Sequence, residues 1–501
     1  MNRGRETHGQ GSAPATERAL TGALRAGVAR ATQNLEPGLP IGPWGARADQ
    51  RAVGVHRPPT VTALVLGELA APDPAAVIVA IDTVSWSAEL GAQTAEAIAS
   101  AVGVPADSVF LAASHTHSSL PLDEAYLAPW DPTGHAREVR SRLLAELPGL
   151  AARAAASLRP ARAIATRAPC AVARSRRQRA FDRLLVGVDG VVEDATVDVV
   201  DFLGDDGASI ATIVAYGCHP TVLAWGNLLV SPDYVGGLRE ITERELGAPT
   251  LFLQGCGADR AAAAGFSNSV EDAEAVGRAI GHVACGALLE SRQALLEIAP
   301  VRIVESGAAL CVTRAALPDA APAGVFAGTG AVQLPLRPRD LAAAQARVED
   351  ARRRVAAGDS AASVDLQRAV IEQELCWRFP AGDSGRAQLT LIRVGDVALV
   401  GWPGELCGAY DRAFHAAGAP VHTIVATSVG DSVGYLPAYE QFAEGGYEVD
   451  ASPFLPSAAQ LAVERAGSLV ADSNRHVQSG AAREKEVPRR RMSSSRRKEN
   501  A

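Results

Sequence analysis

The chain has 501 residues, 21% of them charged, and a formal net charge of −8. This length is enough for two or three domains or one large one, and the negative balance gives no overall basic field that would attract nucleic acid or an anionic membrane. The sequence offers no run of roughly 18 apolar residues for a membrane span and no apolar leader in its first 20 residues, which predicts a cytoplasmic protein without stable membrane insertion.

Residues 1–20 are polar and aperiodic, and residues 476–501 form a polar, basic tail. Both ends are predicted to be disordered. They would flank one catalytic domain over residues 21–475. Binding of RNA or lipid by the tail is the less favoured alternative to a solvated terminus.

Between the ends, short apolar runs alternate with helical patterns, as in the run at 61–69, the run at 75–84 and the helical stretch at 87–103. Several of the strand-like runs are too polar for an all-parallel core. The pattern predicts an α/β fold of mixed β-sheets flanked by helices. An Ala/Pro/Gly-rich passage at 315–337 is predicted to be a long connection, and a helical hairpin is expected at about 338–376.

Cysteine chemistry gives little sign of a site. The seven cysteines are scattered and never in CxxC spacing, which argues against a disulfide framework and against a thiolate zinc site. They are expected to be free thiols, mostly buried.

Histidine chemistry is more informative. In "LAASHTHSSLP", His115 and His117 follow a buried strand-like run, and side chains two apart on a strand share one face. This geometry suits one metal ligand and one acid/base helper, although such histidines can also simply pack. His219 likewise follows a strand-like run, in "AYGCHPTVL", where α/β proteins collect catalytic groups.

Glu405 in "WPGELCG" follows another apolar run on a tight turn, where burial would be costly without a cation; the alternative is a glutamate in the first turn of a helix. Nitrogen and oxygen ligands without thiolates suit Zn²⁺ or a similar divalent ion. The sequence has no HExxH helix and no GxSxG elbow, which excludes thermolysin-type and α/β-hydrolase chemistry.

The order of these motifs resembles the catalytic domain of the neutral/alkaline, non-lysosomal ceramidases. The matching segments include "SHTHS", "ARS" at 173–175, "CHPT", "LFLQGCGAD", "PGEL" and "GYLPAYEQF" with "GGYEV", and the similarity spans roughly residues 38–470. The chain stops about where the family's additional C-terminal immunoglobulin-like domain would begin.

The resemblance implies a site. It assigns Zn²⁺ to four ligands, His115, His219, Glu405 and Tyr435. It assigns catalytic roles, in contact with the substrate or beside the metal, to His117, Arg174 and Asp259.

Two departures from the family pattern concern the site: Ala261 replaces the family's active-site serine, and Ser119 and Leu120 replace the glycine and proline that follow the HTHS motif. The expected function is hydrolysis of an amide by a metal-activated water, acting on a small N-acyl compound and not on membrane ceramide. The alternatives are an esterase or lactonase that uses the same site, and a catalytically impaired protein that binds metal or ligand.

Overall fold

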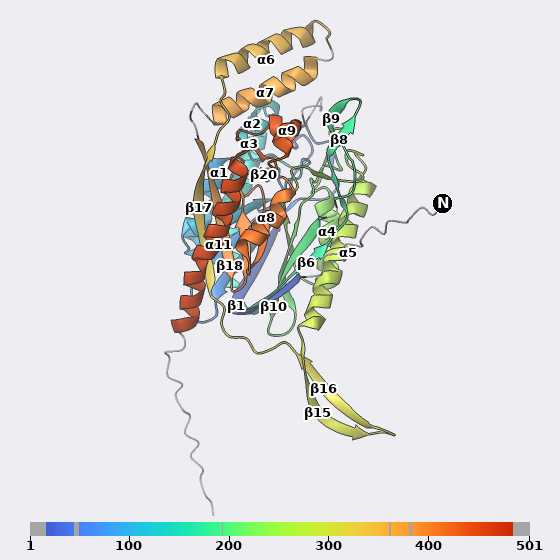
Figure 1. Cartoon of the computed structure of the whole chain (residues 1–501), viewed down its shortest axis with the longest axis vertical. Helices are drawn as coiled ribbons and strands as arrows, with labels where there is room; N and C mark the ends of the chain where they lie inside the picture. Colours follow the sequence, from blue (N-terminus) through green and yellow to red (C-terminus); the bar gives the residue numbers. More distant parts are fainter. Residues whose placement is uncertain are drawn as a thin grey trace, which may run out of the picture.

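The computed structural model describes residues 17–44, 50–192, 194–359, 362–379, 382 and 384–483. Two β-sheets pack face to face, and helices cover their outer faces, so the body has four layers (Figure 1). The two sheets and their helical covers confirm the predicted mixed α/β architecture. The described helices include none that is long and apolar enough to cross a bilayer.

The larger sheet has eight strands and mixes parallel with antiparallel pairs. In spatial order its strands are β13 (Thr250–Gln254), β11 (Ser209–Tyr216), β10 (Thr196–Gly204), β6 (Arg159–Pro169), β1 (Glu17–Thr32), β3 (Thr60–Glu68), β4 (Ala76–Ile81) and β5 (Val109–Ala113). The edge strand β13 contacts β4 and β5 at the other edge, so the sheet curls and brings its two ends together.

The smaller sheet has four strands, with an antiparallel part and one parallel pair. In order they are β17 (Val325–Pro335), β18 (Ser384–Val394), β19 (Val397–Gly401) and β21 (His422–Ala426). Alternate side chains of β18 and β19 face the larger sheet, and the others face the helices behind, because successive strand residues point to opposite faces. This pattern explains why β19 is apolar along its whole length.

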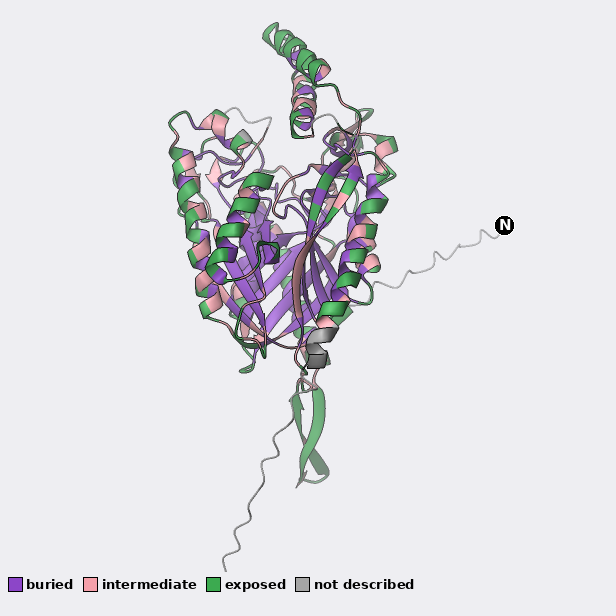
Figure 2. Cartoon of the chain, turned by 90° about the vertical axis from the view of Figure 1, so that its left-hand side faces the viewer, coloured by how far each residue is buried: buried purple, intermediate pink, exposed green. Residues whose placement is uncertain are grey.

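Amphipathic helices complete the layers (Figure 2). The longer helices are α1 (Ala88–Val102), α3 (His135–Ala156), α4 (Tyr234–Leu246), α5 (Val270–Ala294), α6 (Leu341–Ala356), α7 (Ala362–Arg378), α8 (Ala409–Gly418) and α11 (Ala458–Arg483). Helices α1 and α3 cover one part of the larger sheet, α4 and α5 cover another, and α8 and α11 cover the smaller sheet.

Short elements connect the layers at the ends of the strands. The helical ones are η1 (Ala106–Ser108), α2 (Glu124–Leu127), η2 (Ala128–Trp130), α9 (Gln441–Glu444) and α10 (Tyr447–Asp450). The short strand pairs are β2 (Gly54–Val55) with β12 (Leu229–Val230), β7 (Ala173–Ser175) with β14 (Arg260–Ala262), β8 (Arg177–Ala180) with β9 (Arg183–Val186), and β20 (Glu405–Leu406) with β22 (Tyr435–Leu436).

Two hairpins project from the body in Figure 1. Helices α6 and α7 form one of them and lie where a helical hairpin was expected. The other consists of β15 (Glu297–Glu305) and β16 (Ala309–Ala316), which pair with each other in a sheet of their own.

The structure differs from the sequence-based expectation in three places. Within the passage at 315–337, residues 325–335 are strand β17 and not a connection, because its glycines and small residues pair with β18 along its length. Strand β1 begins at Glu17, and helix α11 continues to Arg483, inside the segments expected to be disordered. The remaining parts of those terminal segments, 1–16 and 484–501, lie outside the described residues.

A buried ion pair in the larger sheet gives a prediction for acid stability. Arg167 donates from Nε and Nη2 to the carboxylate of Asp198 at 2.9 and 3.0 Å. Burial by itself would raise the pKa of Asp198, but Arg167 and His422 lower that pKa to about 2. The folded-state pKa therefore lies below the ordinary value, so the pair stabilises the fold at higher pH, and this stability is lost as the pH falls toward 2.

We expect Asp198→Asn to lower the free energy of unfolding near neutral pH by about 2 kcal/mol, the size implied by the pKa shift. Urea denaturation of both proteins over an acid pH series measures the difference, which should shrink as the pH falls from about 4 to 2. A difference that stays constant over this range would contradict the assignment.

Candidate metal centre

The histidine pair lies at the end of β5, where the chain leaves the sheet. His115 has a positive φ of 67°, which is uncommon for a residue other than glycine and turns the chain sharply after the strand. The backbone N–H of His115 donates to the carbonyl of Thr83, and its Nδ1 lies 2.8 Å from the carbonyl oxygen of Val84. The segment that follows β4 therefore fixes both the backbone and the ring of His115.

His219 reaches the same place from β11. Its Nδ1 lies 2.6 Å from the carbonyl oxygen of Gly257, in the loop after the neighbouring parallel strand β13. The carboxyl ends of adjacent parallel strands lie at the same edge of a sheet, which brings these two loops together. The third histidine, His117, places its Nδ1 3.1 Å from the carbonyl oxygen of Pro43.

These three hydrogen bonds determine the tautomers. A carbonyl oxygen only accepts, so in a neutral imidazole the proton lies on Nδ1 and the lone pair lies on Nε2. One ligand atom from each of the three histidines lies within 4.8 Å of those of the other two. Each Nε2 is buried and has no hydrogen-bond partner among the described residues. Three buried imidazole lone pairs thus converge, as in sites where backbone carbonyls orient histidine ligands.

Glu405 and Tyr435 approach from the smaller sheet. Strands β20 and β22 run parallel, and Glu405 lies directly opposite Tyr435 in their register. The Oε2 atom of Glu405 lies 3.3 Å from Nε2 of His115 and 3.1 Å from Nε2 of His219. This oxygen is also buried without a hydrogen-bond partner within the described part of the chain.

The protonation states suit a cation. Burial, followed by the charge of Arg176, lowers the pKa of His219 to about 4, and burial lowers the pKa of His117 well below its ordinary value. Burial would raise the pKa of Glu405, but the neighbouring histidines hold it well below the usual range. Near neutral pH His117 and His219 are thus neutral imidazoles and Glu405 is a carboxylate, the forms that bind metals.

The pKa of the Tyr435 phenol is set by opposing effects. Burial and the nearby Glu405 carboxylate raise the pKa of its phenol well above 10. The guanidinium of Arg176 lies 5.6 Å from the ring centroid and opposes this shift. The phenol therefore carries its proton unless a further cation is added beside it.

Arg176 is buried between the site and α10. Its Nε donates to Glu448 at 2.9 Å, while its Nη2 is buried and has no partner among the residues that the structure describes. Burial would lower the pKa of Arg176, but Tyr435 and Glu448 raise it well above the ordinary value, so the guanidinium stays charged. It gives the site a fixed positive charge.

Two solved structures have a fold similar to that of this chain. A ceramidase "complexed with C2" matches with a TM-score of 0.62 at 16% identity, over 90% of this chain and 76% of that chain. The neutral ceramidase from Pseudomonas aeruginosa matches with a TM-score of 0.62 at 17% identity, over 90% of this chain and 75% of that one. This chain has a neutral ceramidase-like fold. No family model and no curated protein matches it by sequence.

Within this ceramidase-like fold, His115, His117, His219, Glu405 and Tyr435 come together, but Arg174 does not join them. The Nη1 of Arg174 donates to the carbonyl oxygens of Ala171, Val172 and Ala173, so its guanidinium binds the backbone of its own loop. Arg176, two residues later, lies beside Tyr435 instead. Four of the six residues at 174–179 are arginines, and the sequence gives no local signal for which of them enters the site.

Asp259 lies in the loop beside the metal centre and accepts hydrogen bonds from two other segments of the chain. Its Oδ1 accepts from the N–H of Gly408 and its Oδ2 from Nε2 of Gln441, both at 2.7 Å. Ala261 pairs with His219 in an isolated bridge and is fully buried. Both carboxylate oxygens of Asp259 are thus engaged in positioning the loops that carry Glu405 and Tyr435.

An aromatic cluster beside His117 was missed in the sequence. The ring of Trp44 lies 5.2 Å from the ring of His117 and 5.9 Å from each of Trp225 and Phe266. Isolated aromatic residues far apart in the sequence carry no signal that they will meet. The structure shows that the third histidine has an apolar aromatic wall next to it.

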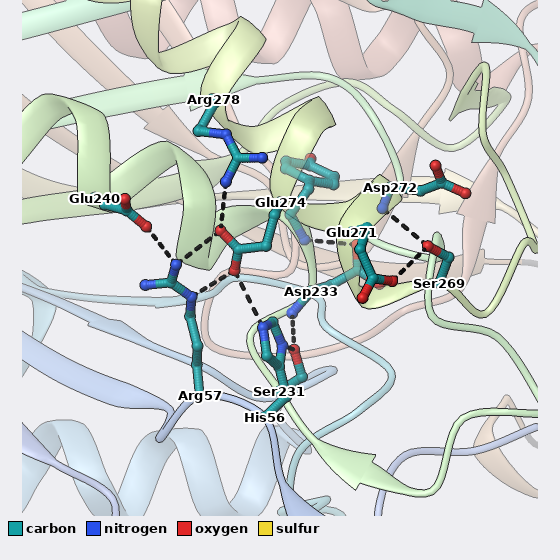
Figure 3. A network of polar contacts seen from close by, with 11 residues as sticks. His56, Arg57, Ser231, Asp233, Glu240, Ser269, Glu271, Asp272, Glu274 and Arg278 are labelled. Atoms are coloured by element: carbon teal, nitrogen blue, oxygen red, sulfur yellow. Dashed lines mark hydrogen bonds and ion pairs between the residues drawn. The ribbon is translucent and has the colours of Figure 1, made fainter.

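A polar network supports the histidine loop from behind (Figure 3). His56 lies between Ser231 and Glu274, with Nδ1 3.0 Å from the serine hydroxyl and Nε2 3.2 Å from the carboxylate. Ser231 is fully buried; its carbonyl oxygen accepts from Oγ1 of Thr116 and its backbone N–H donates to the carbonyl of Ser118. Because its hydroxyl is inaccessible, this serine, histidine and glutamate brace the loop and do not form a nucleophilic triad.

Proposed function

We propose that this protein is a zinc-dependent hydrolase that cleaves an amide bond in N-acyl compounds. The observation that carries the proposal is the convergence of three buried imidazole Nε2 lone pairs and one carboxylate oxygen, each without a hydrogen-bond partner among the described residues. Leaving these buried polar atoms unpaired would cost several kcal/mol, roughly 1–3 for each, and a divalent cation would remove that cost at His115, His219 and Glu405. The proposed ligands are His115, His219, Glu405 and Tyr435.

A bound Zn²⁺ would supply a water of lowered pKa and would polarise the substrate carbonyl. The side chains around it divide the remaining work. His117 has a free Nε2 beside the ligand atoms and can accept a proton from the attacking water and pass it to the leaving amine. Arg176 can donate from Nη2 to an oxygen that becomes negative.

The fold of the matching ceramidases supports an amide as the substrate class, whereas an ester or lactone would use the same groups. Ala261 supports the rival proposal of a protein that binds without turnover, because no hydroxyl is available at that position. Neither proposed step requires such a hydroxyl, so we favour hydrolysis. A small acyl compound is proposed in preference to ceramide.

The deciding experiment combines metal analysis with a substrate panel. Purified protein is expected to hold about one Zn²⁺ per chain and to hydrolyse N-acyl amides of graded acyl length, with matched esters as the comparison. A chelator should abolish this activity, and added Zn²⁺ should restore it. Zinc without hydrolysis across both series would favour the binding protein, and hydrolysis unaffected by chelators would refute the metal site.

Metal retention is expected to persist to unusually low pH. The pKa of His219 is already lowered to about 4, so protons compete for its Nε2 only as the pH approaches that value. Zinc content measured after dialysis over an acid series should stay constant until the pH nears about 4, provided the fold is intact by circular dichroism. Loss of zinc near pH 6.5, where an ordinary imidazole titrates, would contradict this assignment.

A further inference from the structure

The β15–β16 hairpin extends away from the four-layered body like an arm (Figures 1 and 2). Neither strand pairs with any other described strand. Nearly all of its residues are exposed, including Ile298 at 72% and Ile303 at 70%. An isolated two-stranded hairpin is only marginally stable in water, so an arm of this kind gains from being covered.

The two faces of the arm differ in character. The strand register places the charged Glu297, Arg302 and Arg314 on one face, together with the apolar Val304, Leu310 and Val312. The opposite face is apolar apart from Thr313 and its tip, where Glu305 supplies its one charge. This apolar face consists of Ile298, Pro300, Ile303, Glu305, Ala309, Cys311, Thr313 and Ala315.

A cavity of about 700 Å³ lies at the foot of the arm. Leu296 and Leu317, which directly flank the two strands, are among its lining residues. Arg162 lines it too, and donates hydrogen bonds to the carbonyl oxygens of Thr21 and Pro318. Arg292, Asp205 and Asp319 also line the cavity, and Arg292 pairs with Asp201. Burial lowers the pKa of the Arg162 guanidinium despite the nearby Asp319, so a carboxylate placed directly against Arg162 would be favourable.

We propose that the arm is a dimerisation element: two copies of this chain lay their arms antiparallel, apolar face against apolar face, about a two-fold axis. In this arrangement the tip of each arm lies at the foot of the other. Glu305 then reaches the cavity that holds Arg162 of the partner subunit. The contact is self-complementary, as a two-fold interface requires, because each copy contributes one tip and one foot.

The dimensions agree with this pairing. Strands of this length extend for roughly 30 Å, so an antiparallel overlap of the whole arm joins tip to foot. The two arm faces alone would bury on the order of 600 Å² in total, about half of what a stable interface needs. Insertion of the tips into the foot cavities must add the rest, and we expect a dimer that dissociates at about micromolar concentration.

A lipid surface is a poorer occupant of this face. Glu305 would have to enter the apolar layer with its charge unpaired, which is costly. The arm also lacks the aromatic side chains that anchor segments at membrane interfaces. A second copy of the chain supplies both an apolar face for the arm and a cation, Arg162 of the partner subunit, for Glu305 at the tip.

Cys311 provides a direct test. It lies one residue pair beyond the middle of the apolar face, so the two copies of Cys311 would lie close to the axis. It is the exposed cysteine, whereas the other six are buried. A short bismaleimide should cross-link the protein into a covalent dimer at micromolar concentration, and Cys311→Ser should abolish this product. Absence of the cross-linked dimer, with Cys311 shown to react with a monomeric maleimide, would overturn the proposal.

A charge exchange tests the register. Glu305→Arg and Arg162→Glu should each weaken dimerisation by at least about tenfold in sedimentation velocity, and the double variant should regain most of the loss. Weakening that the double variant does not reverse would refute the tip-to-foot contact. Co-sedimentation with anionic phosphatidylserine vesicles, lost on Ile303→Asp, together with a monomer in solution would also refute it. These measurements do not depend on metal binding or hydrolysis. The dimer proposal can therefore fail while the proposed function holds, and the proposed function can fail while the dimer proposal holds.

Discussion

Replacement of His219 by alanine is expected to remove the bound zinc and lower kcat/KM for amide hydrolysis by about 10³-fold. His219 supplies one of the converging Nε2 atoms, and its ring is fixed by the carbonyl of Gly257. In the alanine variant Glu405 keeps the contact with His115 and loses the one with residue 219, so the cation loses a ligand and the carboxylate loses a neighbour. Metal analysis and steady-state kinetics of the same preparations measure both effects.

The matched control is His135→Ala, which makes the same chemical change at a half-exposed histidine paired with Glu36. This control should keep its zinc and its activity. Full zinc content in His219→Ala would show that this histidine is not a ligand. Loss of both metal and activity in the control would show that the assay reports general damage and not the site.

The second large effect is expected from Arg239→Met. Arg239 in α4 donates from both Nη atoms to Asp82, at 2.6 and 2.8 Å, and both residues are buried. Removal of the cation leaves the buried carboxylate without its ion-pair partner, which typically costs about 3–5 kcal/mol. Asp82 directly precedes Thr83 and Val84, whose carbonyls hold His115, so the metal affinity should fall as well.

Urea denaturation near neutral pH measures the stability loss, and zinc titration measures the affinity. Burial would raise the pKa of Asp82, but Arg239 holds it below the ordinary value. The ion pair therefore stabilises the fold at pH values above the pKa of Asp82. The difference in free energy of unfolding between the variant and the wild type should shrink as the pH falls through that pKa. The double variant Asp82→Asn/Arg239→Met should recover most of the stability, because the unpaired charge is gone. A double variant as unstable as Arg239→Met would assign the loss to packing.

Local pattern was sufficient for much of this molecule. The apolar periods at β4, β5 and α1 predicted their type, because a strand or helix that buries one face must repeat with the period of its backbone. The same reasoning placed His115, His117, His219 and Glu405 at the ends of apolar strands. The meeting of these four residues in one place was implied by resemblance, not by any pattern within the sequence.

Tertiary structure decided what depends on partners distant along the chain. Arg176, and not Arg174, enters the site because Glu448, 272 residues away, pairs with its Nε. Strand β17 forms in a passage rich in small residues because β18 pairs with it along its length. The histidine tautomers depend on carbonyls of separate loops. Composition and period describe which face of an element is apolar, but the identity of the opposing atoms is fixed only when the sheets and loops pack.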